Sequence, residues 1–257
     1  MTYSLYLDKA REAATAAEAV ILKYFGKGVD VQLKGDLSPV TQADIETEEV
    51  IRGILSKAFP EHGFFGEETG KSQADAEFLW LVDPIDGTKS FVRDTPFFST
   101  QIALMHKGEL VVGVSNAPAY QQQAWAAKGE GAFLNGQAVR CSDISDWPQV
   151  SLSVGNLKTL AGDAAGWRRY GELVTQVNRL RGYGDFCHYH MLAAGQFELV
   201  LESDVNILDI AALSVIVHEA GGVFTDLAGN ALDLDTTTVL AAGSAKLHAA
   251  SLAHMQG

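Results

Sequence analysis

Two aspartates three positions apart, Asp83 and Asp86, are the part of this sequence best suited to chemistry. They follow an apolar run of strand length, Phe78 to Val82. Pro84 lies between them, and because its ring fixes φ and removes an amide donor, the turn is stiff. Two carboxylates on one tight turn suit a hard cation such as Mg²⁺, which prefers oxygen ligands. The alternative is a turn whose aspartates only cap backbone amides.

Gly87 and Thr88 follow the second aspartate, at a predicted helix start. Exposed backbone amides at a helix start can bind a phosphate oxygen. Together with the apolar strand before the turn, this Gly-Thr pair favours a metal site over a simple turn.

The overall charge restricts the partners. The chain carries 32 acidic and 19 basic residues, a formal net charge of -13. Such a surface repels nucleic acid and anionic membranes, so we expect neither as a partner. A protein that binds phosphate must offset this field locally, and bound divalent cations would do so.

Length and cysteine content indicate a folded intracellular protein. The 257 residues fit one large domain or two closely packed halves. Cys141 and Cys187 are too few for a disulfide framework, which favours a reduced, cytoplasmic setting. The N-terminus does not resemble a secretory signal, and no apolar run approaches the roughly 20 residues that span a bilayer.

The first half of the sequence predicts two helices beside a mainly antiparallel sheet. One helix extends from Leu7 to about Phe25, and after a turn at 34–36 a second begins at a cap in 41–44 and extends to about Phe59. The expected apolar face of the second helix is Ile45, Val50, Ile51, Ile54 and Leu55. Strands are expected at 78–82, 98–105, 110–115 and 122–127, with a hairpin turn at 129–136.

The second half alternates strands with helices, which predicts an α/β arrangement. The expected strands are 150–154, 179–183 and 197–201, and the expected helices are 167–178, 186–194 and 210–220. We place a soft boundary near residue 145, which gives an N-terminal α+β half, 1–145, and a C-terminal α/β half, 146–257.

Several motifs together resemble the inositol monophosphatase family. They are Asp-Pro-Ile-Asp-Gly-Thr at 83–88, Gly-Glu-Glu at 66–68, Asp-Ile-Ala-Ala at 209–212 and Glu-Ala-Gly-Gly at 219–222. Their order and spacing match from the first helix to about residue 245. The resemblance implies a layered α-β-α-β-α sandwich of the inositol monophosphatase and fructose-1,6-bisphosphatase type. It also implies a magnesium-dependent phosphomonoesterase, commonly a homodimer, in which a metal-activated water attacks phosphorus directly.

The resemblance also implies a set of metal ligands. Glu67, Asp83 and the carbonyl oxygen of Ile85 would bind one Mg²⁺, and a weaker third ion would lie near Glu67. The second ion would be bound by Asp83, Asp86 and Asp209, so most ligands belong to the N-terminal half. The phosphate would lie against Asp86, Gly87, Thr88 and Asp209. Two such ions can clamp the attacking and leaving oxygens of an in-line displacement.

The same resemblance assigns the nucleophile site to Asp44, Thr88 and Glu67. Asp44, bonded to the Thr88 hydroxyl, would orient the attacking water and accept its proton. The alternative for Asp44 is a helix cap, and the alternative for Asp209 is a carboxylate that complements a helix dipole. The preference for Glu67 over its neighbour Glu68 rests on the family pattern.

Substrate preference is predicted from four segments that resemble the histidinol-phosphate phosphatase branch, which acts in histidine biosynthesis. They are 89–91, 112–118, 125–129 and the run from Arg181 to Phe186. Histidinol phosphate has a cationic end, which suits Asp185 and Glu202, and Arg181 would shape or neutralise that wall. The alternatives are a helix cap for Asp185 and an exposed strand end for Glu202. Leu208 replaces a tryptophan common in relatives, which predicts a changed pocket wall.

Rival functions follow from the same residues. A phosphatase of the same fold acting on inositol monophosphate or another polyol phosphate is the nearest alternative. A non-catalytic metal-binding regulatory protein is the alternative of a different class. The Asp83–Asp86 spacing argues against a haloacid-dehalogenase mechanism. A zinc site at His188 and His190 is disfavoured because side chains two apart on a helix diverge.

Overall fold

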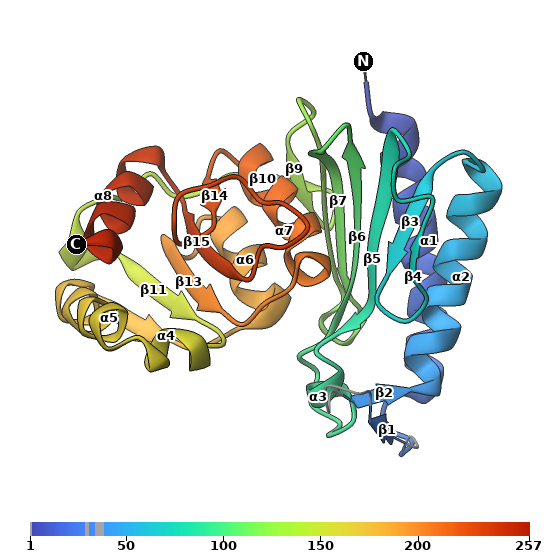
Figure 1. Ribbon diagram of the computed structural model, residues 1–257, viewed down its shortest axis with the longest axis horizontal. Helices are drawn as coiled ribbons and strands as arrows, with labels where there is room; N and C mark the ends of the chain where they lie inside the picture. The colour runs from blue at the N-terminus through green and yellow to red at the C-terminus, as the bar shows by residue number, and fades with distance from the viewer. Residues whose placement is uncertain (1, 29–30, 34–38) are drawn as a thin grey trace.

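The chain folds into five layers, as the resemblance predicts (Figure 1). The computed structural model describes residues 2–28, 31–33 and 39–257, so the turn expected at 34–36 lies outside the described residues. The layers are α1 (Ser4–Tyr24) with α2 (Gln42–Ala58), an eight-stranded sheet, α6 (Asp185–Ala193) with α7 (Ile207–Glu219), a five-stranded sheet, and α4 (Lys158–Gly162), α5 (Ala164–Gln176) and α8 (Ala245–Gln256). The layered α/β sandwich is therefore confirmed.

The eight-stranded sheet is antiparallel except where β3 pairs with β5. Its order is β10 (Gln137–Val139), β9 (Ala132–Leu134), β8 (Gln122–Ala127), β7 (Glu109–Ala117), β6 (Ser99–His106), β5 (Phe78–Asp86), β3 (Gly63–Gly66) and β4 (Gly70–Ser72). A separate small pair joins β1 (Val31–Leu33) to β2 (Pro39–Thr41). The parallel β3–β5 pair matters for function because both strands end at the same edge of the sheet.

The five-stranded sheet is mixed. Its order is β12 (Arg179–Arg181), β11 (Ser151–Val154), β13 (Leu199–Ser203), β15 (Thr238–Ala242) and β14 (Val223–Thr225). β11 pairs in parallel with β12 and β13, whereas β15 is antiparallel to β13 and β14. The eight-stranded sheet ends at Val139 and this one begins with residue 151, so the boundary predicted near residue 145 falls between them and stays a prediction.

Helix α7 is buried almost all round because it is apolar on nearly every face and lies between the two sheets (Figure 1). It approaches β7 so closely that a Cβ at Gly113 would lie 2.2 Å from the carbonyl oxygen of Ala212. Glycine at this position therefore sets the distance between α7 and the large sheet. The first turn of α7 carries Asp209, so this distance also places Asp209 relative to β5.

Helix α1 covers the outer face of the large sheet together with α2. Its alanines at 10, 13, 14 and 17 are fully buried, as the predicted amphipathic pattern requires. On α2 the buried positions are Ala43, Asp44, Thr47, Glu48, Ile51 and Leu55. The prediction that Ile45 lies on the buried face is wrong, since 37% of that residue is exposed. Polar side chains occupy the face instead, because this part of α2 borders the candidate site.

Most other elements lie within a few residues of the expected positions, with three exceptions. β5 continues past Val82 to Asp86 through an irregular register. The segment at 129–136 contains strand β9, and the hairpin turn itself lies at Asn135 and Gly136 between β9 and β10. Strands β1 to β4, β14 and β15 and helices α4 and α8 were not expected. Among the described residues, no helix is long and apolar enough to cross a membrane.

The close approach at Gly113 yields a stability prediction. Gly113→Ala is expected to lower the free energy of unfolding by about 1–3 kcal/mol, because the added methyl forces α7 and β7 apart. The control is Gly53→Ala on α2, where a Cβ would meet nothing within 4 Å. In that helix interior, alanine should stabilise the protein by roughly 0.5–1 kcal/mol. Guanidinium unfolding measures both, and equal effects of the two changes would contradict the close-contact argument.

Candidate active site

Three carboxylates from the two halves of the chain converge at one edge of the large sheet. Asp83, Asp86 and Asp209 each offer an oxygen, and these atoms lie within 4.8 Å of one another. Asp83 and Asp86 end β5, and Asp209 belongs to the first turn of α7. Carboxylate oxygens this close together can bind the same hard cation. The arrangement thus satisfies the minimal geometry of the predicted site.

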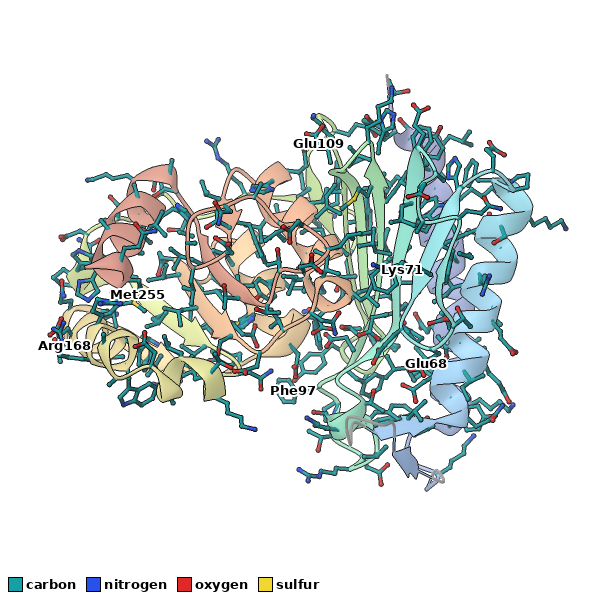
Figure 2. The ribbon with its side chains drawn as sticks, in the orientation of Figure 1. Glu68, Lys71, Phe97, Glu109, Arg168 and Met255 are labelled. Carbon is teal, nitrogen blue, oxygen red and sulfur yellow. The ribbon has the colours of Figure 1, made fainter. Side chains whose placement is uncertain are left out.

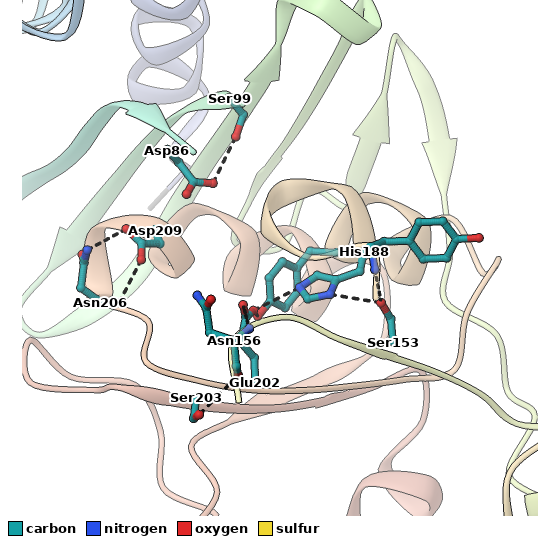
Figure 3. A network of polar contacts seen from close by, with 11 residues as sticks. Asp86, Ser99, Ser153, Asn156, His188, Glu202, Ser203, Asn206 and Asp209 are labelled. Carbon is teal, nitrogen blue, oxygen red and sulfur yellow. Dashed lines mark hydrogen bonds and ion pairs between the residues drawn. The ribbon is translucent and has the colours of Figure 1, made fainter. Parts of the chain in front are cut away.

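The end of β5 is held rigidly. Its pairing with β6 shifts register between Asp83 and Asp86, which lets both carboxylates leave the strand in one region. Asp83 Oδ1 accepts a hydrogen bond from the Ile85 amide at 3.0 Å, and the Pro84 carbonyl accepts one from Thr100 Oγ1 at 2.9 Å. Ser99 Oγ lies 3.4 Å from Asp86 Oδ2 (Figure 3). Asp83 and Asp86 are both buried.

Asp209 is fixed by the start of its helix. It forms a capping box with Asn206, whose amide donates to Asp209 Oδ2 at 3.0 Å and whose Nδ2 donates to Oδ1 at 2.7 Å (Figure 3). The capping role considered for Asp209 therefore exists, and it coexists with membership of the carboxylate cluster. The capping box fixes the Asp209 side chain at the helix start, and the acceptor sites that its two hydrogen bonds leave open can serve a cation.

Glu67 joins this cavity from the parallel neighbour of β5. Its amide donates to the Val82 carbonyl at 3.2 Å, which ties the turn after β3 to the last residues of β5. The cavity, of about 370 Å³, is lined by Glu67, Asp83, Ile85, Asp86 and Asp209 among others. In Figure 2, Glu68 marks this turn and Phe97 marks the segment after α3 (Thr88–Phe91).

Asp44 lies in the first turn of α2, behind Thr88, which lines the cavity. It is buried, and its Oδ2 accepts from both the amide of Thr41 at 2.7 Å and the Thr41 hydroxyl at 2.6 Å. Its Oδ1 lies 3.2 Å from Thr88 Oγ1, so the capping role and the predicted Asp44–Thr88 contact are both present. The Thr88 hydroxyl is also 3.0 Å from the Ile85 carbonyl oxygen. One hydroxyl proton thus faces two acceptors.

Gly87 makes the sharp turn between the cluster and Thr88. Its φ is +88°, and a Cβ there would lie 2.5 Å from the Phe97 carbonyl oxygen. Only glycine fits this position without strain. Gly87 and Thr88 both line the cavity, as the predicted phosphate position requires, and α3 that follows is a single short turn.

The carboxylates of the cluster repel one another when all of them are ionised and no cation is bound. Burial, and next the charge of Glu67, raise the pKa of Asp83 well above its ordinary value. Burial, and next the charge of Asp185, do the same to the pKa of Asp86. Burial raises the pKa of Asp209 to about 7, with Glu67 adding to the effect against the hydrogen bond from Asn206. Without a cation these carboxyls therefore hold their protons to a higher pH than an ordinary aspartate does.

The donor set fits a hard divalent cation. The three clustered side chains all offer carboxylate oxygens, and Glu67 and Ile85 line the same cavity. Nitrogen and sulfur donors are found elsewhere: the buried His188 lies beside Ser153 and Glu202, and His190 contacts Ser115 and Gln122. The two histidines face different partners, as expected from their spacing on α6.

A second acidic group lies on the side of the cavity formed by the five-stranded sheet. Asp185 is half-buried with φ of +47°, and burial together with the charge of Glu202 raises the pKa of Asp185 to about 6. Glu202 is buried, which rules out the exposed strand end considered for it. Its oxygens accept from the Asn156 amide and the Tyr189 hydroxyl, each at 3.0 Å (Figure 3).

Two predicted wall residues lie elsewhere. Arg181 is exposed on β12, where its Nη1 donates to the Leu180 carbonyl at 2.7 Å, and it does not line the cavity. Leu208 lines a neighbouring cleft together with Phe65 and Leu234. Replacement of a tryptophan at this position therefore alters that cleft.

Sequence reasoning missed three residues around the cavity. Asn156 and Asp204 line it, and Glu48 supports the turn that carries Glu67. Hydrogen bonds from Thr159, and next from Ser203, lower the pKa of Asp204 to about 2, so it is ionised at neutral pH. Only Glu48 had a usable signal, because it follows Asp44 by one helical turn and shares its face.

Comparisons with known proteins agree over nearly the whole chain. The model of the inositol monophosphatase family matches residues 4–257. The histidinol-phosphatase of Mycobacterium tuberculosis is 38% identical over 228 residues, which cover 84% of this chain and 85% of that enzyme. The histidinol-phosphatase of Streptomyces coelicolor is 38% identical over 244 residues, which cover 87% and 88%. A solved inositol monophosphatase from Zymomonas mobilis superposes with a TM-score of 0.88 at 30% identity, covering 100% of both chains.

The raised pKa values predict how a cation stabilises the protein. The ordinary pKa of an aspartate in an unfolded chain is about 3.9, whereas that of Asp209 is about 7 in the folded chain. Between these values the folded chain holds protons that the unfolded chain has lost. The free energy of unfolding contributed by the cluster therefore falls as pH rises toward neutrality.

Mg²⁺ is accordingly expected to raise the unfolding temperature more at about pH 8 than at about pH 5.5, where protons compete for the same oxygens. Thermal unfolding in EDTA and in Mg²⁺ at both pH values measures the difference. Asp83→Asn is the control and should lose most of the increase. An increase that is equal or larger at the acidic pH would contradict the assignment.

Proposed function

The chain belongs to the inositol monophosphatase family of phosphatases, and we propose that it hydrolyses L-histidinol phosphate to L-histidinol and phosphate with the help of bound Mg²⁺. The proposal has two parts, a metal-assisted phosphatase centre and an acidic wall that selects a cationic substrate. Different residues form the two.

The proposed choice of substrate depends on the acidic wall, which is formed by Asp185 and Glu202. Asp185 and Glu202 lie side by side around a small recess next to Asp86 and Asp209, lined also by Asn156 and Tyr189. Like charges held together away from water are unfavourable unless a cation lies between them. Histidinol phosphate has an ammonium group and an imidazole to fill that role. A neutral polyol gains less from two carboxylates.

The hydrogen-bond partners of Glu202 hold its carboxylate in a fixed orientation for such a contact. The Asn156 amide and the Tyr189 hydroxyl fix its two oxygens. Gly155 allows the main chain to approach, because a Cβ there would lie 1.8 Å from Glu202 Oε1. A carboxylate with a fixed orientation loses little side-chain freedom on binding a substrate.

The proposed metal ligands are those that the family resemblance implies. Glu67, Asp83 and the carbonyl of Ile85 would hold one Mg²⁺, and a weaker third ion would lie near Glu67. A second ion would be held by Asp83, Asp86 and Asp209. Bound Mg²⁺ would neutralise phosphate charge and lower the pKa of an attacking water. The support is the all-oxygen donor set and the convergence within 4.8 Å.

The remaining residues orient the reactants. Asp44 and Thr88 would hold the attacking water, with the Thr88 hydroxyl donating toward Asp44 or Ile85 and its oxygen free to accept from the water. Asp44 then accepts the proton, and its burial raises its pKa, which makes it a better base than an exposed aspartate. The amides at Gly87 and Thr88 would face the phosphate.

Inositol monophosphate is the second candidate substrate. It is favoured by the superposition on the Zymomonas enzyme over the complete chain. Rates on L-histidinol phosphate and inositol monophosphate, measured side by side with Mg²⁺, decide between the two. Equal rates on the two substrates would show that the acidic wall does not select histidinol phosphate. If no monoester is hydrolysed in a Mg²⁺-dependent way, that result would favour a non-catalytic metal-binding protein. A homodimer and a cytoplasmic setting stay predictions from the sequence.

Asp185→Asn tests the wall. Asparagine tolerates the positive φ of this position, so the change removes charge with little strain. We expect kcat/KM for L-histidinol phosphate to fall by about 10–100-fold, the typical effect of losing a hydrogen bond to a charged group. Activity on a neutral phosphate ester such as p-nitrophenyl phosphate should change by less than about threefold, well under that loss. A parallel fall on both substrates would show that Asp185 does not select the organic group.

Asp86→Asn tests the metal centre. Asp86 would bind the second ion, so its loss should reduce turnover on every phosphate ester to background and should also abolish most of the Mg²⁺-dependent rise in unfolding temperature. Asp94→Asn, on an exposed position beyond α3, is the matched control and should leave both measurements unchanged. Full activity in the Asp86 variant would refute the ligand assignment.

A further inference from the structure

Glu48 is a buried carboxylate that the proposed mechanism does not use. It lies on α2, one turn after Asp44, and its relative exposure is 0%. Its Oε2 accepts from the Glu68 amide at 2.8 Å, and its Oε1 accepts from the Thr69 amide at 2.9 Å and the Thr69 hydroxyl at 2.5 Å. Every one of these donors belongs to the turn that follows β3.

The contacts fix the main chain on both sides of Glu67. Before it, Gly66 lies directly against the buried carboxylate, since a Cβ there would come within 2.4 Å of Glu48 Oε1. At Glu67 itself, the amide donates to the Val82 carbonyl of β5. After it, both following amides donate to Glu48. The turn has little freedom left.

Burying a carboxylate is costly even when it is hydrogen-bonded, and an apolar side chain on α2 would fill the space at lower cost. Unlike an apolar side chain, a carboxylate can accept hydrogen bonds from several amides at once through its two oxygens. This is how outer residues orient the ligands of metal sites.

We propose that Glu48 is a positioning residue for the metal centre: it holds the turn after β3 so that the Glu67 carboxylate faces the Asp83 end of β5. This inference rests on the proposed metal-binding role of Glu67. Since Asp44 lies on the same face of α2, one helix positions both the base and a metal ligand, and small shifts of α2 affect both.

Glu48→Gln is the direct test. The amide group preserves the size of the side chain but turns an NH₂ toward a cluster of three donors, so at least one bond is replaced by a donor–donor contact. We expect the Mg²⁺ concentration for half-maximal stabilisation against thermal unfolding to rise by about tenfold, the usual effect of disturbing an outer-shell contact. The Mg²⁺ concentration for half-maximal activity should rise in parallel, while KM for the phosphate ester at saturating Mg²⁺ stays unchanged.

Glu49→Gln is the matched control, because Glu49 is the exposed neighbour on the same helix and loses the same charge. It should leave the Mg²⁺ dependence unchanged. Thr69→Val removes only the hydroxyl bond and keeps the side-chain shape, so a smaller rise of about two- to threefold is expected. This variant carries the test if the glutamine variant does not fold.

The outcomes separate the positioning role from the function. If Glu48→Gln lowers the unfolding temperature in EDTA but leaves half-saturation by Mg²⁺ unchanged, Glu48 only stabilises the fold and the proposal is overturned. If the unchanged protein is stabilised by Mg²⁺ but hydrolyses no phosphate ester, the proposed function fails, and the thermal titration still decides the role of Glu48.

Discussion

The mutual repulsion of three carboxylates, two of them buried and one half-buried, is the constraint around which this fold is arranged. Two unit charges separated by the 4.8 Å that bounds this cluster repel by about 3 kcal/mol at an effective dielectric constant of about 20. Three such pairs approach the roughly 5–15 kcal/mol that stabilises a typical domain. The cluster must therefore hold protons or cations, and the raised pKa values of Asp83, Asp86 and Asp209 express that requirement.

Hydrogen bonds and close packing hold the elements that carry the cluster in place against this repulsion. The irregular end of β5 is tied down by Thr100, the start of α7 by its capping box, and the turn after β3 by Glu48. Helix α7 cannot retreat, because it lies between two sheets and contacts the backbone of β7 at Gly113. Rigid surroundings of this kind keep ligands in place whether or not the charge is neutralised, which suits a site that loads its cation from solution.

Local patterns in the sequence predicted those features that depend on neighbours along the chain. The apolar run before Asp83, the cap at Thr41 and the periodicity of α1 each required only short spacings, and the structure has all of them. The convergence of Asp209 with Asp83 was different, because it followed from a resemblance and not from spacing. Strands β14 and β15 and helix α8 were missed because short or all-round apolar segments carry little periodic signal.

The other misses arise from tertiary contacts. Ile45 was expected to be buried because it is apolar, yet that side of α2 is turned toward solvent and the buried side carries Asp44 and Glu48. Arg181 is the last residue of β12, and its side chain donates to the Leu180 carbonyl instead of lining the cavity. The carboxylate cluster draws mainly on the large sheet and α7, whereas Asp185 and Glu202 come from α6 and the small sheet. Because the two sets lie on different layers, substitutions of Asp185 or Glu202 would alter the acidic wall without moving the three clustered aspartates.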